Sequence, residues 1–144
     1  MVKDTLRIKG LLQIFNAKTG ELLFEKQNLV VNSGLNMVID RLKVNTINPL
    51  SYIAVGTGDT PVTATDSALQ TEILRKEIDD IDTVNNVLTA EAQFEDYEAI
   101  ALWKEVGMFN ASIGGVMFNR INISFNKTTQ DAVRVLFTIT LTAV

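Results

Sequence analysis

The sequence of 144 residues contains no cysteine and no histidine. Without cysteine the chain has no disulfide, no thiolate zinc site, no iron–sulfur cluster and no cysteine nucleophile. Without histidine it has no Ser-His-Asp triad, no histidine-ligated metal and no general base of the kind that usually works near neutral pH. Together the two absences predict a protein that is not an enzyme.

Positive charge is also scarce, with 13 Lys and Arg against 17 Asp and Glu and a net charge of -4. This is the wrong sign for a phosphate-binding surface, and the basic residues are dispersed, so we expect no free nucleic acid as a partner. Long apolar runs are missing as well, and the first residues do not form the apolar core of a signal peptide. We therefore expect a soluble protein without membrane insertion or signal-directed export.

Alternating apolar and polar residues fill most of the chain, which has only two prolines. The alternation is clearest near the end, where Val133, Val135 and Phe137 face one way and the residues between them the other. Strands are expected at residues 6–15, 21–31, 50–55, 73–83, 87–95, 103–110, 116–125 and 132–143. This pattern predicts one all-β domain over residues 1–144, mainly β with one short helix. The expected architecture is an antiparallel β-sandwich, immunoglobulin-like or jelly-roll-like.

One segment changes from the period of a strand to that of a helix. Leu35, Val38, Ile39 and Leu42 follow the i, i+3, i+4, i+7 spacing, and Ser33 stands where an N-cap residue is expected. The spacing predicts a helix of about ten residues that packs its single apolar stripe onto the sheet.

The glycine-containing segment that follows, Gly56-Thr57-Gly58, has two possible interpretations. It is similar to a fragment of a phosphate-binding turn, but the third glycine and the following long helix of a dinucleotide site are missing. We therefore expect a loop at a sheet edge in which glycine allows positive φ. Farther along, Asp66 is expected to cap one helical turn that runs to Leu69.

Carboxylates gather in two places, around residue 80 (Asp79, Asp80, Asp82) and around residue 95 (Glu91, Glu95, Glu98). The first group is either a calcium site or a set of solvated charges, and it lacks the spacing and the glycine of an EF-hand loop. The second is either a pair of acids for glycoside hydrolysis or a row of exposed charges on a strand face. No metal site or catalytic site is predicted from either group.

Three aromatic residues, Trp103, Tyr52 and Tyr97, allow a different function. Aromatic rings stack on the apolar faces of sugars, so an exposed platform of these rings would bind a glycan. A single tryptophan is more commonly an anchor in a core or an interface. We keep these residues as candidate contacts with a glycan or a protein partner.

The order of several segments resembles the small β-rich structural proteins of tailed bacteriophages, of the tail-fibre, collar and baseplate-associated type. The resemblance covers roughly residues 28–141, and its segments are Asn28–Leu35, Tyr52–Pro61, Thr65–Leu69, Glu72–Lys76, Lys104–Ala111, Gly115–Arg120, Asn126–Thr128 and Phe137–Leu141. It implies structural loop roles for Gly56, Gly58 and Pro61, a capping role for Asp66 and a core-filling role for Leu69. It also implies that the strand containing Glu105 lies in the centre of the sheet.

The resemblance further implies a virion component without catalysis or cofactor, synthesised in the cytoplasm of the host bacterium. Its partners would be other copies of itself, as a trimer or hexamer, and other virion proteins of the tail, neck or fibre. Fibre proteins of this type commonly continue into a shaft or receptor-binding tip, which these residues do not include. Two alternatives stay open: a carbohydrate-binding β-sandwich for host-surface glycans, and a head-fibre or capsid decoration protein.

Overall fold

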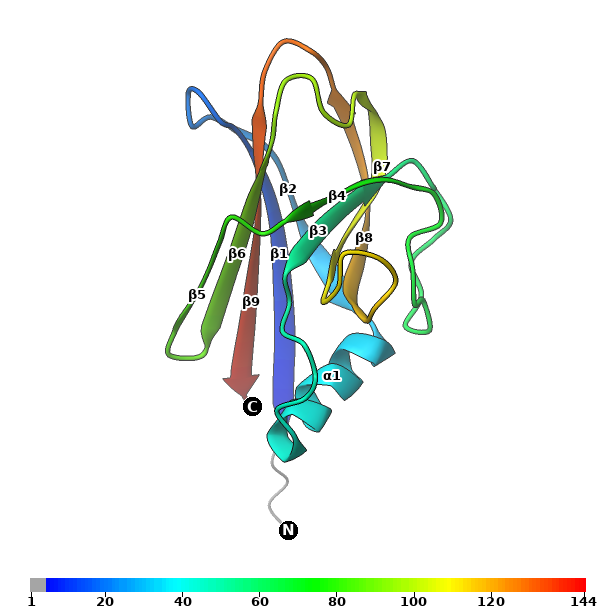
Figure 1. Ribbon diagram of the computed structural model, residues 1–144. Helices are drawn as coiled ribbons and strands as arrows, with labels where there is room; N and C mark the ends of the chain where they lie inside the picture. Colours follow the sequence, from blue (N-terminus) through cyan, green and yellow to red (C-terminus); the bar gives the residue numbers. More distant parts are fainter. Residues whose placement is uncertain (1–4) are drawn as a thin grey trace.

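The computed structural model describes residues 5–144 as strands packed around one core, with one helix at an end (Figure 1). The elements are β1 (Leu6–Asn16), β2 (Leu22–Val30), α1 (Asn32–Lys43), β3 (Tyr52–Gly56), β4 (Glu72–Glu77), β5 (Asp80–Val84), β6 (Val87–Phe94), β7 (Ala101–Phe109), β8 (Met117–Lys127) and β9 (Val133–Ala143). Residues 57–71 form the long β3–β4 loop. Within residues 5–144, no helix is long and apolar enough to cross a membrane.

The strands form one nine-stranded sheet in the order β4-β3-β7-β8-β2-β1-β9-β6-β5, and every pairing is antiparallel. The sheet folds on itself at β2. This strand pairs with β1 along most of its length, but with β8 only at Leu29 and Val30. The prediction of an all-β antiparallel sandwich with one short helix is confirmed, and β2 makes its two layers parts of one sheet.

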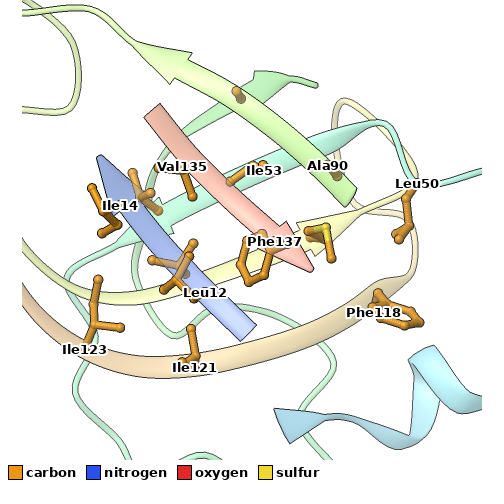
Figure 2. Close-up of a cluster of buried hydrophobic side chains, with 14 of the residues drawn as sticks. Leu12, Ile14, Leu50, Ile53, Ala90, Phe118, Ile121, Ile123, Val135 and Phe137 are labelled. Atoms are coloured by element: carbon orange, nitrogen blue, oxygen red, sulfur yellow. The ribbon is translucent and has the colours of Figure 1, made fainter. Parts of the chain in front are cut away.

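The core lies between the two layers (Figure 2). One layer contributes side chains from β1, β6 and β9, and the other contributes side chains from β3, β7 and β8. The core side chains labelled in Figure 2 are these strand residues and Leu50 of the α1–β3 connection: Leu12, Ile14, Leu50, Ile53, Ala90, Phe118, Ile121, Ile123, Val135 and Phe137. The alternation predicted for β9 is observed: its apolar residues Val133, Val135 and Phe137 are buried against the facing layer, and the residues between them are more exposed.

The single strand expected at residues 73–83 is two strands that belong to different layers. β4 pairs with β3, whereas β5 pairs with β6. At the crossing, the backbone N–H of Ile78 donates to the carbonyl of Ser51, and that of Asp79 donates to the carbonyl of Glu91. The chain thus changes layers between Glu77 and Asp80, and the prediction of one continuous strand is wrong.

The helix starts before its expected cap. Val31 occupies the N-cap position, and no side chain caps the helix there. Ser33 lies inside the first turn, where its Oγ donates to the carbonyl oxygen of Met117 at 2.6 Å. The predicted capping role of Ser33 is wrong, because this contact draws the hydroxyl toward β8.

The buried face of α1 matches the predicted apolar stripe only at Val38, which packs partly buried against the core. The helix packs through Gly34 and Met37, and a Cβ at residue 34 would overlap the backbone of Phe118. This close approach turns Leu35, Ile39 and Leu42 outward, with exposed fractions of 39%, 64% and 83%. The helix is therefore oriented by its glycine, and three large apolar side chains remain in contact with solvent.

Candidate functional site

Two charged residues lie side by side on the outer face of the layer formed by β3, β7 and β8. Gly56 of β3 pairs with Glu105 of β7, and Gly107 of β7 pairs with Arg120 of β8. Because paired residues and residues two apart share a face of a sheet, Glu105 and Arg120 project to the same side, opposite to the core residue Val106. Both are almost completely removed from solvent.

The β3–β4 loop covers this face and supplies donors to the carboxylate of Glu105. Oε1 accepts hydrogen bonds from the backbone N–H of Gln70 at 2.7 Å and from Nε of Arg120 at 3.0 Å. Oε2 accepts from the backbone N–H groups of Gly58 at 2.8 Å and Thr71 at 2.7 Å. A buried carboxylate is tolerated when it is paired and hydrogen-bonded in this way. Glu105 therefore holds both ends of the loop against the sheet.

Gly56 and Gly58 make this close approach possible. A Cβ at Gly56 would lie 2.7 Å from Oε2 of Glu105, and one at Gly58 would lie 2.5 Å from the same oxygen. Positive φ among the described glycines occurs at Gly20, Gly114 and Gly115 instead. The prediction of structural roles for Gly56 and Gly58 agrees with this geometry, but the expected positive φ is wrong.

Arg120 extends the network to the middle of the loop. Its Nη1 donates to Oδ2 of Asp66 at 3.0 Å, and its Nη2 donates to the carbonyl and hydroxyl oxygens of Thr60 at 3.1 and 3.2 Å. Next to it, Asn122 donates from Nδ2 to the carbonyl of Thr60 and accepts from the backbone N–H of Val62. We call Glu105, Arg120, Asp66 and the loop groups that they bind the Glu105–Arg120 network.

Asp66 closes a turn of the loop and caps no helix. Its Oδ2 accepts from the backbone N–H of Thr63 at 3.0 Å, and its Oδ1 accepts from the Thr63 hydroxyl at 2.9 Å. The loop has no helical turn between Asp66 and Leu69, so the predicted helix cap is wrong. Burial alone would raise the pKa of Asp66, but the bonds from Thr63 and Arg120 outweigh it, so the pKa lies below its ordinary value.

The other two loop residues singled out from the sequence have different environments. Leu69 is buried and fills a small second core on the outer face, together with Val31, Ala54, Phe109 and Met117. This position agrees with the predicted core-filling role. Pro61 is exposed at the surface of the loop.

Glu105 and Arg120 do not present a reactive group to solvent. Both oxygens of Glu105 already accept two hydrogen bonds each, and the guanidinium is enclosed by the loop. A general acid or base has to reach a substrate proton at hydrogen-bond distance. The arrangement instead fixes a long loop that has little regular secondary structure of its own.

The three aromatic candidates do not form a platform. Trp103 has an exposed fraction of 0%: its ring meets that of Phe94 edge-to-face at 5.1 Å, and its Nε1 donates to the carbonyl of Ala99. The proposed contact role of Trp103 is therefore wrong, because the ring is a core residue. Tyr52 is half-buried against the cluster around Leu69, whereas Tyr97 is 74% exposed in the β6–β7 loop.

The two acidic groups are not brought together as ligands. Oδ2 of Asp79 accepts from the backbone N–H of Gln93 at 2.7 Å, and Asp80 and Asp82 are exposed on β5. Among residues 5–144, no group of three or more acidic residues is placed to hold a metal ion. In the second group, Glu98 forms an ion pair with Lys76 at 2.7 Å.

A third buried charge, Lys127, stabilises the β6–β7 loop. Its Nζ donates to the carbonyl oxygens of Glu95 at 2.8 Å, Thr128 at 3.0 Å and Asp96 at 3.4 Å. Burial of the ammonium lowers the pKa of Lys127, although nearby carboxylates act in the opposite direction. The residue thus ties a loop to β8 through main-chain oxygens, as Glu105 does through main-chain N–H groups.

An apolar groove opens at the end of the sandwich that is lowest in Figure 1. It lies between α1 and the lower parts of β5, β6 and β9 and has a volume of about 440 Å³. We call it the α1–β5 groove, and its apolar lining includes Met37, Leu42, Leu50, Ile81, Phe118 and Leu141. The hydrophobic core therefore reaches the surface at this end.

Sequence reasoning missed both Glu105 and Arg120 as partners. The available signal is a charged residue directly before an apolar residue within each expected strand, Glu105 before Val106 and Arg120 before Ile121. A comparison of the chain with protein-family models, curated proteins and solved structures gives no match. Several segments that carry the resemblance meet in the Glu105–Arg120 network, through Gly58, Asp66 and the two charged residues themselves.

Proposed function

We propose that the chain is a structural protein of a tailed-bacteriophage virion, associated with the tail, neck or fibre, and that it acts by assembling with copies of itself and docking to other virion proteins. Its place of action is the virion, after synthesis in the host bacterial cytoplasm. The proposal is supported by the order of segments that resembles such proteins, because those segments include the residues of the Glu105–Arg120 network.

The single observation that carries the proposal is the contrast between buried charges and exposed apolar groups. Glu105, Arg120 and Lys127 are buried and satisfied by hydrogen bonds inside the chain. Large apolar side chains, by contrast, face solvent along α1 and around the α1–β5 groove. An apolar surface of this kind marks a place where another surface docks.

The ends of the sheet offer a second means of assembly. β4 and β5 are its terminal strands, so each has one edge without a neighbouring strand among residues 5–144. Such an edge can accept a strand from another chain. Asp80 and Asp82 on β5 disfavour indiscriminate pairing, so this edge requires a partner that compensates their charge.

The same surfaces would also serve a head-fibre or capsid decoration protein, which differs only in its place on the particle. The glycan-binding alternative is weakened, because Trp103 is enclosed in the core and Tyr97 is the remaining exposed aromatic candidate. We therefore retain assembly as the proposed function.

Purified tailed particles from the infected source culture provide the test. An antiserum raised against the recombinant chain is applied to an immunoblot of gradient-purified particles and of the particle-free supernatant. We expect the chain to sediment with the particles at a constant ratio to the major capsid protein. If the chain is synthesised during infection but is found only in the supernatant, the proposal is wrong.

A further inference from the structure

β2 and β8 are paired along only a short part of their length. Close to α1 their ladder contains two residue pairs, Leu29 with Arg120 and Val30 with Asn119, and then it ends. Toward the opposite end of the sandwich the two strands separate (Figure 1), although both continue as strands. We call the region between residues 22–28 of β2 and residues 121–127 of β8 the β2–β8 seam.

Main-chain groups of β2 point into this seam. The N–H of Val31 donates to the carbonyl oxygen of Phe118 on β8 at 3.2 Å. Residues two apart in a strand direct their main-chain groups to the same side, so Gln27 and Glu25 also direct theirs toward β8. The same register would place Gln27 opposite Asn122, but the ladder has already ended before that position. β2 therefore has an open edge within the sheet as well as a paired one.

Lys26 bridges the seam where the next main-chain hydrogen bond is missing. Its Nζ donates to the carbonyl oxygen of Asn122 at 2.7 Å. In a continued ladder that oxygen would accept from the N–H of Gln27. A lysine on an open edge disfavours indiscriminate strand pairing. The seam thus combines an accessible main-chain edge with a positive charge.

Apolar and polar side chains of the seam both lack partners. A hollow of about 300 Å³ opens at its far end, where Leu23, Phe125 and Val133 form the apolar part of the lining. At its near end, Oδ1 and Nδ2 of Asn28 are buried and have no hydrogen-bond partner among residues 5–144. Buried polar groups normally have such a partner. The seam therefore offers an apolar surface, an unsatisfied amide and an open main-chain edge in one place.

We propose that the β2–β8 seam receives an extended segment of a different virion protein, which inserts as a strand between β2 and β8. The segment pairs with the open edge of β2 and donates a main-chain N–H to the carbonyl of Asn122, which releases the ammonium of Lys26. Its core-facing side chains are apolar, because they meet Leu23 and Phe125, and it carries a carboxylate next to Lys26. This inference rests on the proposed assembly function and states the chemistry of the partner. The contact is separate from the α1–β5 groove.

The pairing of the described strands identifies the occupant as a different polypeptide. A strand inserted between two others needs both of its edges free. Each strand of residues 5–144 is already paired with at least one neighbour, and the terminal strands β4 and β5 have one open edge each. On β5, moreover, Oδ1 of Asp82 accepts from the main-chain N–H of Thr83 at 2.8 Å. A second folded copy therefore has no strand to insert, and the occupant is a segment that belongs to no sheet of its own.

A proline at the open edge tests the insertion. Gln27→Pro removes an N–H that lies beyond the end of the β2–β8 ladder, so the free chain should keep its fold, as checked by circular dichroism and urea unfolding. Epitope-tagged Gln27→Pro should fall about tenfold or more below wild type in gradient-purified particles, because the inserted strand loses a hydrogen bond and meets the proline ring. Glu77→Pro makes the same substitution in the edge strand β4 and should be incorporated like wild type.

A charge reversal tests the carboxylate of the partner without proline. Lys26→Glu keeps an exposed charged side chain but repels a carboxylate in the seam, so its incorporation should also fall. Lys18→Glu, at an exposed position of the β1–β2 turn, should be incorporated like wild type.

Photo-crosslinking in assembled particles identifies the occupant. With benzoylphenylalanine in place of Gln27, we expect a crosslink to a different virion protein, and with the same group in place of Glu77 we expect none to that protein. The inference is overturned if folded Gln27→Pro or Lys26→Glu is incorporated at the wild-type level, or if the crosslink joins two copies of the chain. In those cases wild type is still found in particles, and the proposed function stands. Absence of wild type from particles is the distinct result that overturns the proposed function and this inference together.

Discussion

Nε of Arg120 donates to Oε1 of Glu105 at 3.0 Å, in a place where both side chains are almost fully enclosed by the β3–β4 loop. The pair connects two neighbouring strands, β7 and β8, to a loop whose bound groups lie between 47 residues (Gly58) and 34 residues (Thr71) before Glu105 in the chain. The sheet therefore provides the charges, and the backbone of the loop provides most of the donors. The hydrogen bonds between these sheet side chains and the loop backbone explain how a long loop keeps one conformation.

The first prediction concerns the carboxylate itself. In Glu105→Gln, an amide NH₂ replaces one oxygen and faces backbone donors, and Arg120 loses its buried counter-charge. We expect the free energy of unfolding to fall by about 3–5 kcal/mol, as for other broken buried ion pairs. Urea unfolding measures this value. The control Glu77→Gln changes an exposed carboxylate of β4 and should lie within about 0.5 kcal/mol of wild type; equal losses in both variants would contradict the account.

The second prediction concerns the close approach at Gly58. In Gly58→Ala the new methyl group would overlap the Gln70 side chain and lie 2.5 Å from Oε2 of Glu105. We expect a loss of about 1–3 kcal/mol, as for other overpacked sites, together with faster amide exchange across residues 57–71. Hydrogen exchange by mass spectrometry detects the second effect. Ser67→Ala, at an exposed position of the same loop, should leave exchange unchanged.

The third prediction is a dependence on pH. The pKa of Asp66 is lowered in the folded state from its ordinary value of 3.8. The ionised side chain therefore contributes stability at neutral pH that is lost as pH falls from about 4 through the lowered pKa. Asp66→Asn should be less stable than wild type by about 1–2 kcal/mol at pH 7, and the difference should shrink on acidification. A difference that stays constant from pH 7 to pH 2.5 would contradict this prediction.

The fourth prediction separates a core tryptophan from a binding tryptophan. Trp103→Ala removes a ring that packs against Phe94 and Phe125, so we expect a loss of about 3–5 kcal/mol in thermal or urea unfolding. Tyr97→Ala, in an exposed loop, should change stability by less than about 0.5 kcal/mol. A glycan-binding role for Trp103 would require the opposite result, a stable variant that has lost affinity for cells.

The strands were predictable where one face of each meets the core, because burial imposes a period of two on β1, β6 and β9. The boundary between β4 and β5 was not, since isoleucines recur on both sides of it, at Ile73, Ile78 and Ile81, while the chain passes between layers. The orientation of α1 was missed for a related reason. Periodicity identifies an apolar stripe, but the contact of Gly34 with Phe118 decides which face packs.

The candidate site was predictable only in part. Gly58 and Asp66 are recognisable as loop residues from local sequence, and both belong to the network, whereas Gly56 ends β3 beside Glu105. The pairing of Glu105 with Arg120 depends on the register between β7 and β8, which alternation alone does not determine. Their burial depends on the β3–β4 loop, whose path is set by the same two side chains.

The central claim is that the chain works as an assembly unit through its α1–β5 end. The most direct measurement is the incorporation of epitope-tagged copies into tailed particles during infection, quantified by immunoblot of gradient-purified particles. We predict that tagged wild type and Tyr97→Lys are incorporated equally and that Leu42→Lys, although folded, is left in the supernatant. Incorporation of Leu42→Lys at the wild-type level would contradict the claim, as would the absence of every tagged form from the particles.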